Sequence, residues 1–154
     1  MNAPYWQRKR WAELTTTDLY ALLAARQAVF VVEQQCPYQD LDGYDDRCLH
    51  LWAAQTDGSV LALARLLPPG LKHPEASIGR VLTTAAGRRQ SLGRALMQRA
   101  LAAVEQEWPD HAIRIEAQHY LEAFYQSLGF ATVGPVFDLD GISHVEMLRP
   151  AAAP

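Results

Sequence analysis

The sequence predicts an α/β fold in which helices pack on a mixed β-sheet. Short apolar runs alternate with longer helical patterns, and two Asp-Gly pairs stand between apolar runs, as in β-hairpins. A strand also leads through a polar turn into the longest helical pattern of the chain. The 154 residues are 49% apolar and show no linker or internal repeat, so we expect residues 1–154 to form one domain with a real core.

The first half of the chain predicts one helix among four strands. Thr15 to Asp18 offer N-cap side chains, and a helix follows from Asp18 to Val32 with a buried face of Leu19, Leu22, Leu23 and Phe30. Gln34 to Arg47 is an acidic loop. The expected strands are residues 6–14, 49–54, 60–67 and 77–83, with Asp57-Gly58 turning between the second and third.

The second half predicts two more helices and three more strands. A helix runs from Leu92 to Trp108, carries an apolar stripe and stops at Pro109. A short helix from Tyr120 to Leu128 ends at Gly129, which suits a left-handed cap. The remaining strands are expected at residues 112–117, 132–137 and 143–148, with a turn at Asp140-Gly141 and a frayed tail at 151–154.

Composition argues against several classes of protein. The net charge of -3 does not suit a nucleic-acid binder, and no run of eighteen apolar residues predicts a membrane span. The first ten residues lack the apolar core of a signal peptide. Two cysteines, Cys36 and Cys48, make no disulfide framework, so we expect a reduced, cytoplasmic protein.

The strand, turn and helix from Val81 to Met97 are the strongest functional signal. Unpaired N–H groups and the dipole make a helix start a site for anions, and arginines bind phosphate oxygens in a bidentate manner. Arg88, Arg89 and Arg94 crowd this helix start, where the dipole disfavours cations unless an anion is present. Gly93 leaves the backbone open to close approach. The competing interpretation is a solvated arginine surface with an ordinary glycine.

This stretch resembles the acyl-CoA pyrophosphate motif of the GCN5-related N-acetyltransferases (GNAT). That motif reads Arg/Gln-x-x-Gly-x-Gly/Ala, and Ser91 stands here where the family usually has its first glycine. The resemblance implies the GNAT fold, a mixed, mostly antiparallel, splayed sheet flanked by helices, and pantetheine paired along the preceding strand. The implied acyl-CoA contacts are Val81, Leu82, Thr83, Arg88, Arg89, Gln90, Ser91, Leu92, Gly93, Arg94 and Gln118.

A second block, Tyr120 to Phe130, resembles the late helix of the same family with its Phe-Tyr-x-x-x-Gly-Phe signature. The resemblance implies that Tyr125 is the general acid for the departing thiolate. A phenol suits that role because its pKa of about 10 is close to that of a thiol. The structural alternative makes Phe124 and Tyr125 core aromatics of a short amphipathic helix.

A third block, Arg26 to Gly43, together with Ile78 to Val81, resembles the ElaA-like subgroup of these acetyltransferases. The resemblance extends from about Trp6 to Arg149. The first helix is also similar to that of the acyl-homoserine-lactone synthases, which share an Arg-x-x-x-Phe start but are longer and carry tryptophans near that helix.

The acidic loop is the expected substrate side, where carboxylates would attract an amine cation. The candidate substrate contacts are Arg26, Phe30, Tyr38, Asp40 and Asp42. A turn-rich solvated loop is the alternative, and Arg26 would then pair with Glu33 or a loop aspartate. Glu33 is the first candidate for the general base, with Glu116 and His119 as other candidates.

No metal is expected, because Cys36, Cys48 and His50 lack the spacing of a zinc site. We therefore expect an acetyl-CoA-dependent N-acetyltransferase acting on a small-molecule or peptide amine, with no nucleic-acid or membrane partner. The resemblance also allows a homodimer. Two alternatives stay open: a non-catalytic acyl-CoA-binding sensor, and a synthase of the acyl-homoserine-lactone type.

Overall fold

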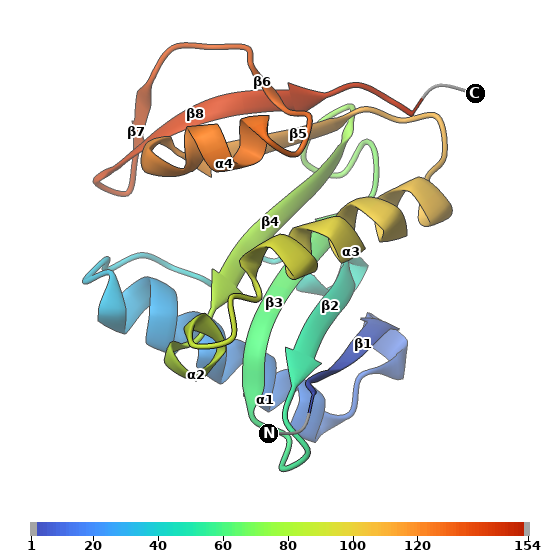
Figure 1. Ribbon diagram of the computed structural model, residues 1–154, viewed down its shortest axis with the longest axis vertical. Helices are drawn as coiled ribbons and strands as arrows, with labels where there is room; N and C mark the ends of the chain where they lie inside the picture. The colour runs from blue at the N-terminus through green and yellow to red at the C-terminus, as the bar shows by residue number, and fades with distance from the viewer. Residues whose placement is uncertain (1–2, 153–154) are drawn as a thin grey trace.

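Eight strands form one mixed sheet in the computed structural model, which describes residues 3–152 (Figure 1). The strand order is β1-β2-β3-β4-β5-β8-β6, and β7 pairs with β8. The strands are β1 (Tyr5–Arg10), β2 (Leu49–Ala54), β3 (Val60–Leu67), β4 (Ala76–Thr83), β5 (Ile113–Gln118), β6 (Ala131–Thr132), β7 (Phe137–Leu139) and β8 (Ile142–Arg149).

Four α-helices accompany the sheet in the described part of the chain: α1 (Thr16–Arg26), α2 (Ala85–Arg88), α3 (Gly93–Glu107) and α4 (Glu122–Gln126). A π-helical segment, Gln27–Glu33, continues α1, and a 3-10 turn, His119–Leu121, leads into α4. The predicted helix from Asp18 to Val32 is thus confirmed as α1 and its extension. Within residues 3–152, no helix has the length and apolar content needed to cross a bilayer.

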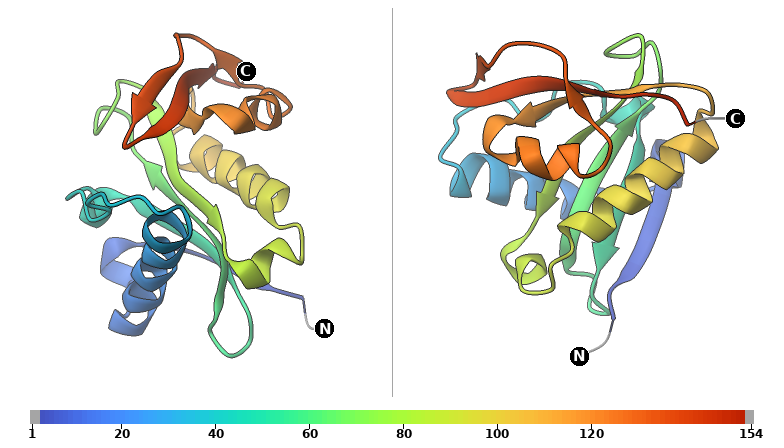
Figure 2. Two further views of the ribbon diagram at one scale, coloured as in Figure 1. Left: turned by 90° about the vertical axis from the view of Figure 1, so that its left-hand side faces the viewer. Right: turned by 45° about the horizontal axis from the view of Figure 1, so that its top comes forward.

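The two faces of the sheet are covered by different helices (Figure 2). On one face, Leu22 and Val29 of the first helix pack with Trp52 and Leu63. On the opposite face, α3 buries the predicted apolar stripe, including Leu96, Ala100 and Val104, against the inner strands. Apolar burial on both faces explains why β2 and β3 read as continuous apolar runs rather than as alternating patterns.

The sheet opens between β4 and β5. All strand pairs are antiparallel except this one, which is parallel and joins only Ala76 to Ile113 and Ser77 to Arg114. Beyond Ser77 the two strands separate, which confirms the expected splay. A bulge in β4 accompanies the opening, since the register against β3 shifts between Leu63 and Arg65 and Arg80 has a φ of 50°.

Three sequence-based boundaries differ from the structure. The first strand ends at Arg10 and gives way to a 3-10 turn, Trp11–Glu13, instead of continuing to residue 14. The single strand predicted over 132–137 is wrong: β6 and β7 are separate, and Gly134 and Pro135 lie between them. Proline has no N–H to donate to a ladder, which favours the break. The short helix α2 was not predicted.

Both predicted hairpin turns are confirmed. Asp140 and Gly141 form the two-residue connection between β7 and β8 and have φ values of 53° and 80°, as a type I′ turn requires. Gly58 turns between β2 and β3 at φ 89°. Gly129 has a φ of 95° at the end of the α4 segment, as expected for a left-handed cap. Of the predicted tail, residues 153–154 lie outside the described residues.

Candidate active site

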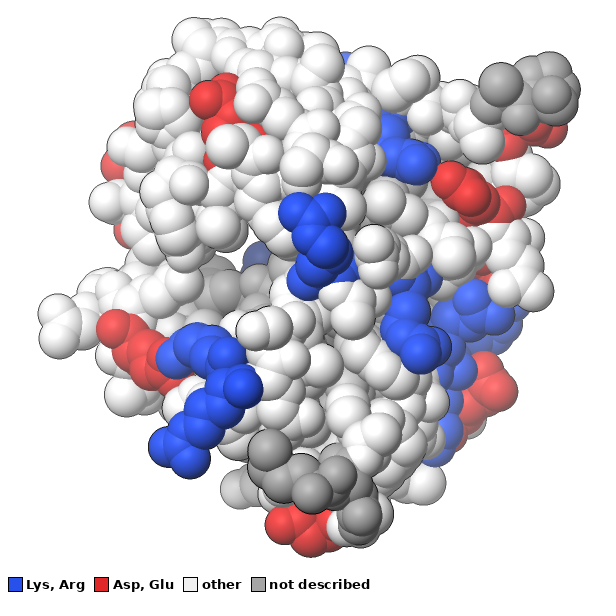
Figure 3. All heavy atoms as spheres, in the orientation of Figure 1, with Lys and Arg blue, Asp and Glu red and all other residues white. Residues whose placement is uncertain are grey.

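The opening between β4 and β5 is a cavity of about 440 Å³. Figure 3 shows the surface hollowed between the part of the molecule formed by β5, α4 and β8 and the part formed by α1 and α2. The cavity brings together many of the residues predicted from the sequence. From the implied cofactor set it is lined by Val81, Leu82, Thr83, Arg88, Gly93 and Gln118, and from the other candidates by Phe30, Tyr38, Glu116 and Tyr125.

One end of the cavity is built by the turn that joins β4 to α3. The Thr84 side chain accepts a hydrogen bond from the N–H of Gly87 (3.2 Å) and donates to the carbonyl of Val60 (3.0 Å), which fixes α2 against β3. A Cβ on Gly87 would lie 1.9 Å from the carbonyl oxygen of Leu61, so only glycine fits there. These contacts hold the turn against β3 and so position the start of α3.

The start of α3 suits an anion. Leu92 occupies the N-cap position and, within the described chain, its side chain caps none of the first N–H groups of α3. A Cβ on Gly93 would meet nothing within 4 Å, because this residue faces open space in the cavity. Ser91 has a φ of 53°, the left-handed region in which glycine is at ease. The serine departs from the family motif, but its backbone takes a conformation that the usual glycine favours.

The arginines of the turn have different surroundings. Arg88 lines the cavity and donates to the carboxylate of Glu33 (2.6 Å) and to the carbonyl of Thr83 (2.9 Å). Arg94 donates to Ser127 (2.9 Å) and lies over the Phe124 ring, so it ties α3 to the α4 segment. Arg89 is exposed and forms no ion pair within residues 3–152. Two guanidinium groups, those of Arg88 and Arg89, are thus within the turn that opens α3.

Tyr125 is both a core aromatic and a wall of the cavity, so the two interpretations of this residue are compatible. Its ring packs edge-on against Phe124 and Phe130, and the residue is 5% exposed. Burial raises the pKa of Tyr125 to about 12. The phenol therefore keeps its proton at neutral pH and can donate it to a group in the cavity.

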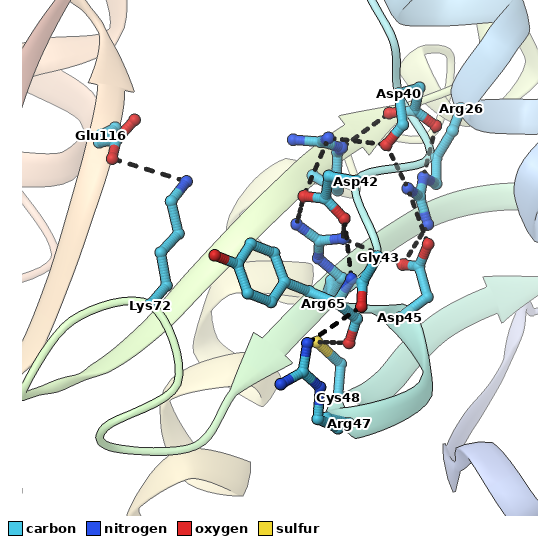
Figure 4. A network of polar contacts seen from close by, with 12 residues as sticks. Arg26, Asp40, Asp42, Gly43, Asp45, Arg47, Cys48, Arg65, Lys72 and Glu116 are labelled. Atoms are coloured by element: carbon cyan, nitrogen blue, oxygen red, sulfur yellow. Dashed lines mark hydrogen bonds and ion pairs between the residues drawn. The ribbon is translucent and has the colours of Figure 1, made fainter.

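The acidic loop is the largest ion-pair network of the described chain (Figure 4). Arg26 is 2% exposed and pairs with Asp40 (2.8 Å) and Asp45 (2.7 Å). Arg65, equally buried, pairs with Asp42 (2.7 Å) and Asp45 (3.0 Å). Arg80 adds a contact to Asp40 at 2.7 Å. Three arginines and three aspartates thus hold the loop on α1, β3 and β4.

The network keeps its aspartates charged. Burial works to raise the pKa of Asp45, but hydrogen bonds from Arg26 and Arg65 outweigh it, and the net pKa lies below the ordinary range. The pKa of Asp42 is lowered against the same burial effect by Arg65. Arg26 is therefore engaged by loop aspartates, as its structural interpretation expected, and Asp40 and Asp42 face arginines of the chain itself.

Two aromatic residues extend from the network into the cavity. Tyr38 donates from its hydroxyl to Asp40 (2.6 Å), and the Arg80 guanidinium lies over its ring. Burial, followed by the hydrogen bond to Asp40, raises the pKa of Tyr38. Phe30 lines the same region from the π-helical segment. The network thus shapes the cavity through Tyr38 rather than through free carboxylates.

The far end of the cavity holds a carboxylate beside two basic side chains. Oε1 of Glu116 on β5 lies 3.5 Å from Nζ of Lys72 and 3.5 Å from Nε2 of His73. All three residues line the cavity. Of the other candidate bases, Glu33 pairs with Arg88 and His119 lies 3.9 Å from Glu122, and neither is among the lining residues.

Sequence reasoning missed four members of the site. Arg65 and Arg80 lie in apolar strands, and a lone arginine in such a run was a usable signal of a buried ion pair. Lys72 and His73 lie in a connecting loop, residues 68–75, where nothing local indicates which strand they contact. Lys72 is one of only two lysines in the sequence, the other being Lys9.

The structure shows no metal centre in residues 3–152, since no three potential ligands gather there. Cys36 and Cys48 are buried free thiols. Burial raises the pKa of Cys48 to about 12, so this thiol is not poised as a nucleophile. His50 is 2.8 Å from the carbonyl of Asp45 and is buried, which lowers its pKa.

Comparison with known proteins agrees with this geometry. A family model described as "Acetyltransferase (GNAT) domain" matches residues 17–149. The Escherichia coli protein ElaA is 42% identical over 146 residues, 94% of this chain and 95% of ElaA. Its crystal structure has a TM-score of 0.88 at 41% identity, covering 96% of this chain and 99% of ElaA. A Pseudomonas aeruginosa acyl-CoA N-acyltransferase superposes with a TM-score of 0.91 at 45% identity, covering 96% of this chain and 99% of that one.

More distant structures share the fold alone. TofI, crystallised in a ternary complex with an inhibitor and MTA, has a TM-score of 0.70 at 17% identity.

The strand–turn–helix, the tyrosine helix and the splayed sheet occur together in a chain that aligns with ElaA over nearly its whole length. The chain therefore belongs to the GNAT acetyltransferase family and, within it, to the ElaA-like proteins.

Proposed function

We propose that this protein transfers an acetyl group from acetyl-CoA to a primary amine by direct attack in a ternary complex. One observation carries the proposal. A single cavity extends from the uncapped start of α3, past Tyr125, to the carboxylate of Glu116. Such a cavity can hold a phosphate-bearing donor at one end and a cationic acceptor at the other, with a protonated phenol between them.

The donor would lie along β4. Beyond Ser77 this strand has no β5 partner, so backbone groups that face this edge, such as the N–H of Thr83, are available to pair with a pantetheine arm as a further strand would. The backbone of Leu82, which the resemblance also implied as a contact, instead faces Leu63 on β3, because the hydrogen bond from the N–H of Thr84 to the carbonyl of Leu61 sets the alternation along the pair. The pyrophosphate would then meet the first N–H groups of α3 and the guanidinium groups of Arg88 and Arg89. Gln118 lines the opposite wall and can hydrogen-bond to the arm.

The residues around the reacting atoms have the chemistry that acyl transfer needs. A backbone N–H on the free edge of β4 would polarise the thioester carbonyl. Tyr125, which is protonated at neutral pH, would give its proton to the departing sulfur. Holding both reactants in one cavity supplies much of the rate through proximity.

The side chains at the acceptor end of the cavity suit an amine. Glu116 already accepts a cationic side chain, so an acceptor ammonium would find the same carboxylate. Because Glu116 lines the cavity, we propose it, with His73 beside it, as the proton acceptor from the amine, ahead of Glu33 and His119. The cavity lining also includes the apolar side chains of Phe30, Leu139 and Ile142, which would suit an acceptor with an apolar body.

Calorimetric titration with acetyl-CoA tests the first step. We expect binding to the wild type and weaker binding to an Arg88→Ala, Arg89→Ala double variant, and no heat with the folded wild type would end the proposal. A screen of amines for release of CoA thiol tests the second step. Binding without release for any amine would favour a sensor, whereas product only with S-adenosylmethionine and longer acyl donors would favour a lactone-type synthase.

A further inference from the structure

A lysine side chain of the protein itself occupies the acceptor end of the cavity. Lys72 leaves the loop between β3 and β4 and points toward Glu116 on β5, which it approaches to 3.5 Å (Figure 4). Its side chain is 35% exposed and lines the cavity. The loop backbone is closed beneath it by a hydrogen bond from the N–H of Gly70 to the carbonyl of His73 (2.8 Å). The flexible stem of Lys72 can therefore swing while its anchor stays in place.

The Nζ of Lys72 lies at a position along β4 toward which the acyl end of a bound donor would point. Ser77 pairs with Arg114, so Glu116, two residues on, stands near the level of Gly79. Leu82 is three residues further, about 10 Å along β4 at the usual strand rise. A donor whose pyrophosphate lies at the start of α3 points its acyl end down β4 from Leu82 toward Gly79. The ε-amino group of Lys72 is thus on the side from which the thioester would be attacked.

We propose that Lys72 is acetylated by the active site of its own chain, an inference that rests on the acetyl-CoA-dependent function proposed above. The ammonium first gives a proton to Glu116, directly or by way of His73. The neutral Nζ then attacks the thioester carbonyl, forming the N–C bond as the C–S bond breaks. The thiolate takes a proton from Tyr125, and the second proton of the attacking amine returns to the Tyr125 phenolate. The amide nitrogen keeps one hydrogen, and the products are N-acetyl-Lys72 and CoA.

The modification would change the acceptor end of the cavity. Acetylation removes the positive charge of lysine, so the ion pair with Glu116 is lost. The carboxylate, whose side chain is 21% exposed, then keeps His73 as its one ion-pair partner among residues 3–152 and can accept the ammonium of a free substrate. Lys72 would therefore act first as an internal acceptor and, once acetylated, no longer compete for Glu116.

The second lysine provides an internal control. Lys9 lies on β1, pairs with Asp18 at 2.9 Å, lies over the Trp52 ring and is not among the cavity residues. The full chain would be incubated with isotope-labelled acetyl-CoA and digested with trypsin. Because acetyl-lysine resists trypsin, modification of Lys72 leaves the peptide 66–80 uncut. A parallel digest at glutamate leaves Lys9 within the peptide 1–13, and mass spectrometry of the two digests gives the occupancy of both lysines over time.

We expect Lys72 to be labelled at least about ten-fold faster than Lys9, since the cavity holds the amine near the donor. The rate constant should not change with protein concentration, and Tyr125→Phe and Glu116→Gln should both slow labelling of Lys72 alone. Lys9→Arg should leave labelling of Lys72 unchanged. Lys72→Arg keeps the positive charge but cannot be acetylated, so the labelled, uncut peptide 66–80 should be absent.

Equal labelling of both lysines, labelling of Lys72 that survives Tyr125→Phe, or a rate constant proportional to protein concentration would each overturn the inference. Its failure is separable from that of the proposed function. Acetyl-CoA binding and transfer to an added amine without labelled Lys72 would refute self-acetylation alone, whereas absence of acetyl-CoA binding would refute both.

Discussion

The carboxylate of Glu33 lies 2.6 Å from Nη2 of Arg88 and so joins the end of the first helix to the turn before α3. Arg88 is also held by the carbonyl of Thr83, on the strand proposed to carry pantetheine. A residue considered as a base and a residue considered as a phosphate ligand are therefore partners. A phosphate at this turn would compete with Glu33 for the same guanidinium group.

We expect Glu33→Gln to bind acetyl-CoA more tightly, by up to about five-fold, because an exposed pair of this kind contributes at most about 1 kcal/mol. Both side chains are more than a third exposed, so the loss of unfolding free energy should be small. Calorimetry and urea unfolding measure the two effects.

The kcat of Glu33→Gln, compared with that of Glu116→Gln, decides which carboxylate accepts the proton, and we expect the larger loss for Glu116→Gln.

Tyr125→Phe should lower kcat by about 10² to 10⁴, the usual effect of losing a general acid, while acetyl-CoA affinity is kept. The hydroxyl makes no hydrogen bond to any residue of 3–152, so its removal leaves no buried group unsatisfied and the fold should be as stable as before. Steady-state kinetics and calorimetry on the same preparation check this. Unchanged kcat with an acceptor that the wild type uses would exclude the role.

The same tyrosine makes stability depend on alkaline pH. Its folded pKa of about 12 lies above the unfolded value of about 10, so the unfolded chain loses the proton first. The folded state therefore binds more protons between these values and loses stability as pH rises from about 10 to 12. Denaturation series should show a steeper alkaline loss for the wild type than for Tyr125→Phe, and parallel losses would contradict the raised pKa.

Asp45→Ala should destabilise the fold by about 3–5 kcal/mol, because it leaves the buried guanidinium groups of Arg26 and Arg65 without their shared partner. The adjacent Asp46 is a matched control: its side chain is 60% exposed and lies 3.6 Å from Arg47. Asp46→Ala should stay within about 0.5 kcal/mol of the wild type. Similar losses from both substitutions in urea unfolding would show that the network does not hold the loop.

The network also predicts the response to acid. The pKa values of Asp42 and Asp45 are lowered on folding, so their contribution is present above the unfolded value of about 4 and is lost as pH falls below it. Unfolding free energy should fall more steeply below that pH in the wild type than in Asp45→Asn. An equal acid slope in the two proteins would contradict the lowered pKa of Asp45.

Two glycines of the turn should respond in opposite ways to alanine. Gly87→Ala would push a methyl group against the backbone of Leu61, 1.9 Å from its oxygen, and should destabilise the protein by several kcal/mol. Gly93→Ala meets open space and improves helix propensity by up to about 1 kcal/mol, so the fold should not suffer. Its methyl group would instead enter the cavity, and acetyl-CoA affinity should fall. Full acetyl-CoA affinity in Gly93→Ala would indicate that the donor does not bind at the start of α3.

Ser91→Gly should stabilise the protein, by about 1 kcal/mol, since serine is held at φ 53° where only glycine avoids the steric cost. Ser91→Ala, which keeps the Cβ, is the control and should bring no such gain. Thermal unfolding of the three proteins compares them directly. A destabilised glycine variant would indicate that the serine side chain contributes more than its backbone conformation costs.

Local patterns were sufficient for most elements. The apolar stripe from Leu92 to Val104 identified α3, the alternation around Ile113 and Ile115 identified β5, and the Asp-Gly pairs marked both hairpins. These signals succeed because helix and strand periodicity and turn chemistry depend on neighbours in sequence. The strand expected at 132–137, before the turn at Asp140-Gly141, was wrong because Gly134 and Pro135 interrupt it.

The sequence by itself determined the fold class, the turn at Arg88 to Gly93 and the placement of Tyr125 on a helix, because each depends on residues close together in the chain. Only the tertiary structure decided which charged side chains pair with one another. It joined Arg26, Arg65 and Arg80 to three loop aspartates, paired Glu33 with Arg88, and placed Lys72 beside Glu116. Those partners are separated by 14 to 55 residues along the chain, so folding, not local propensity, brings their charges together.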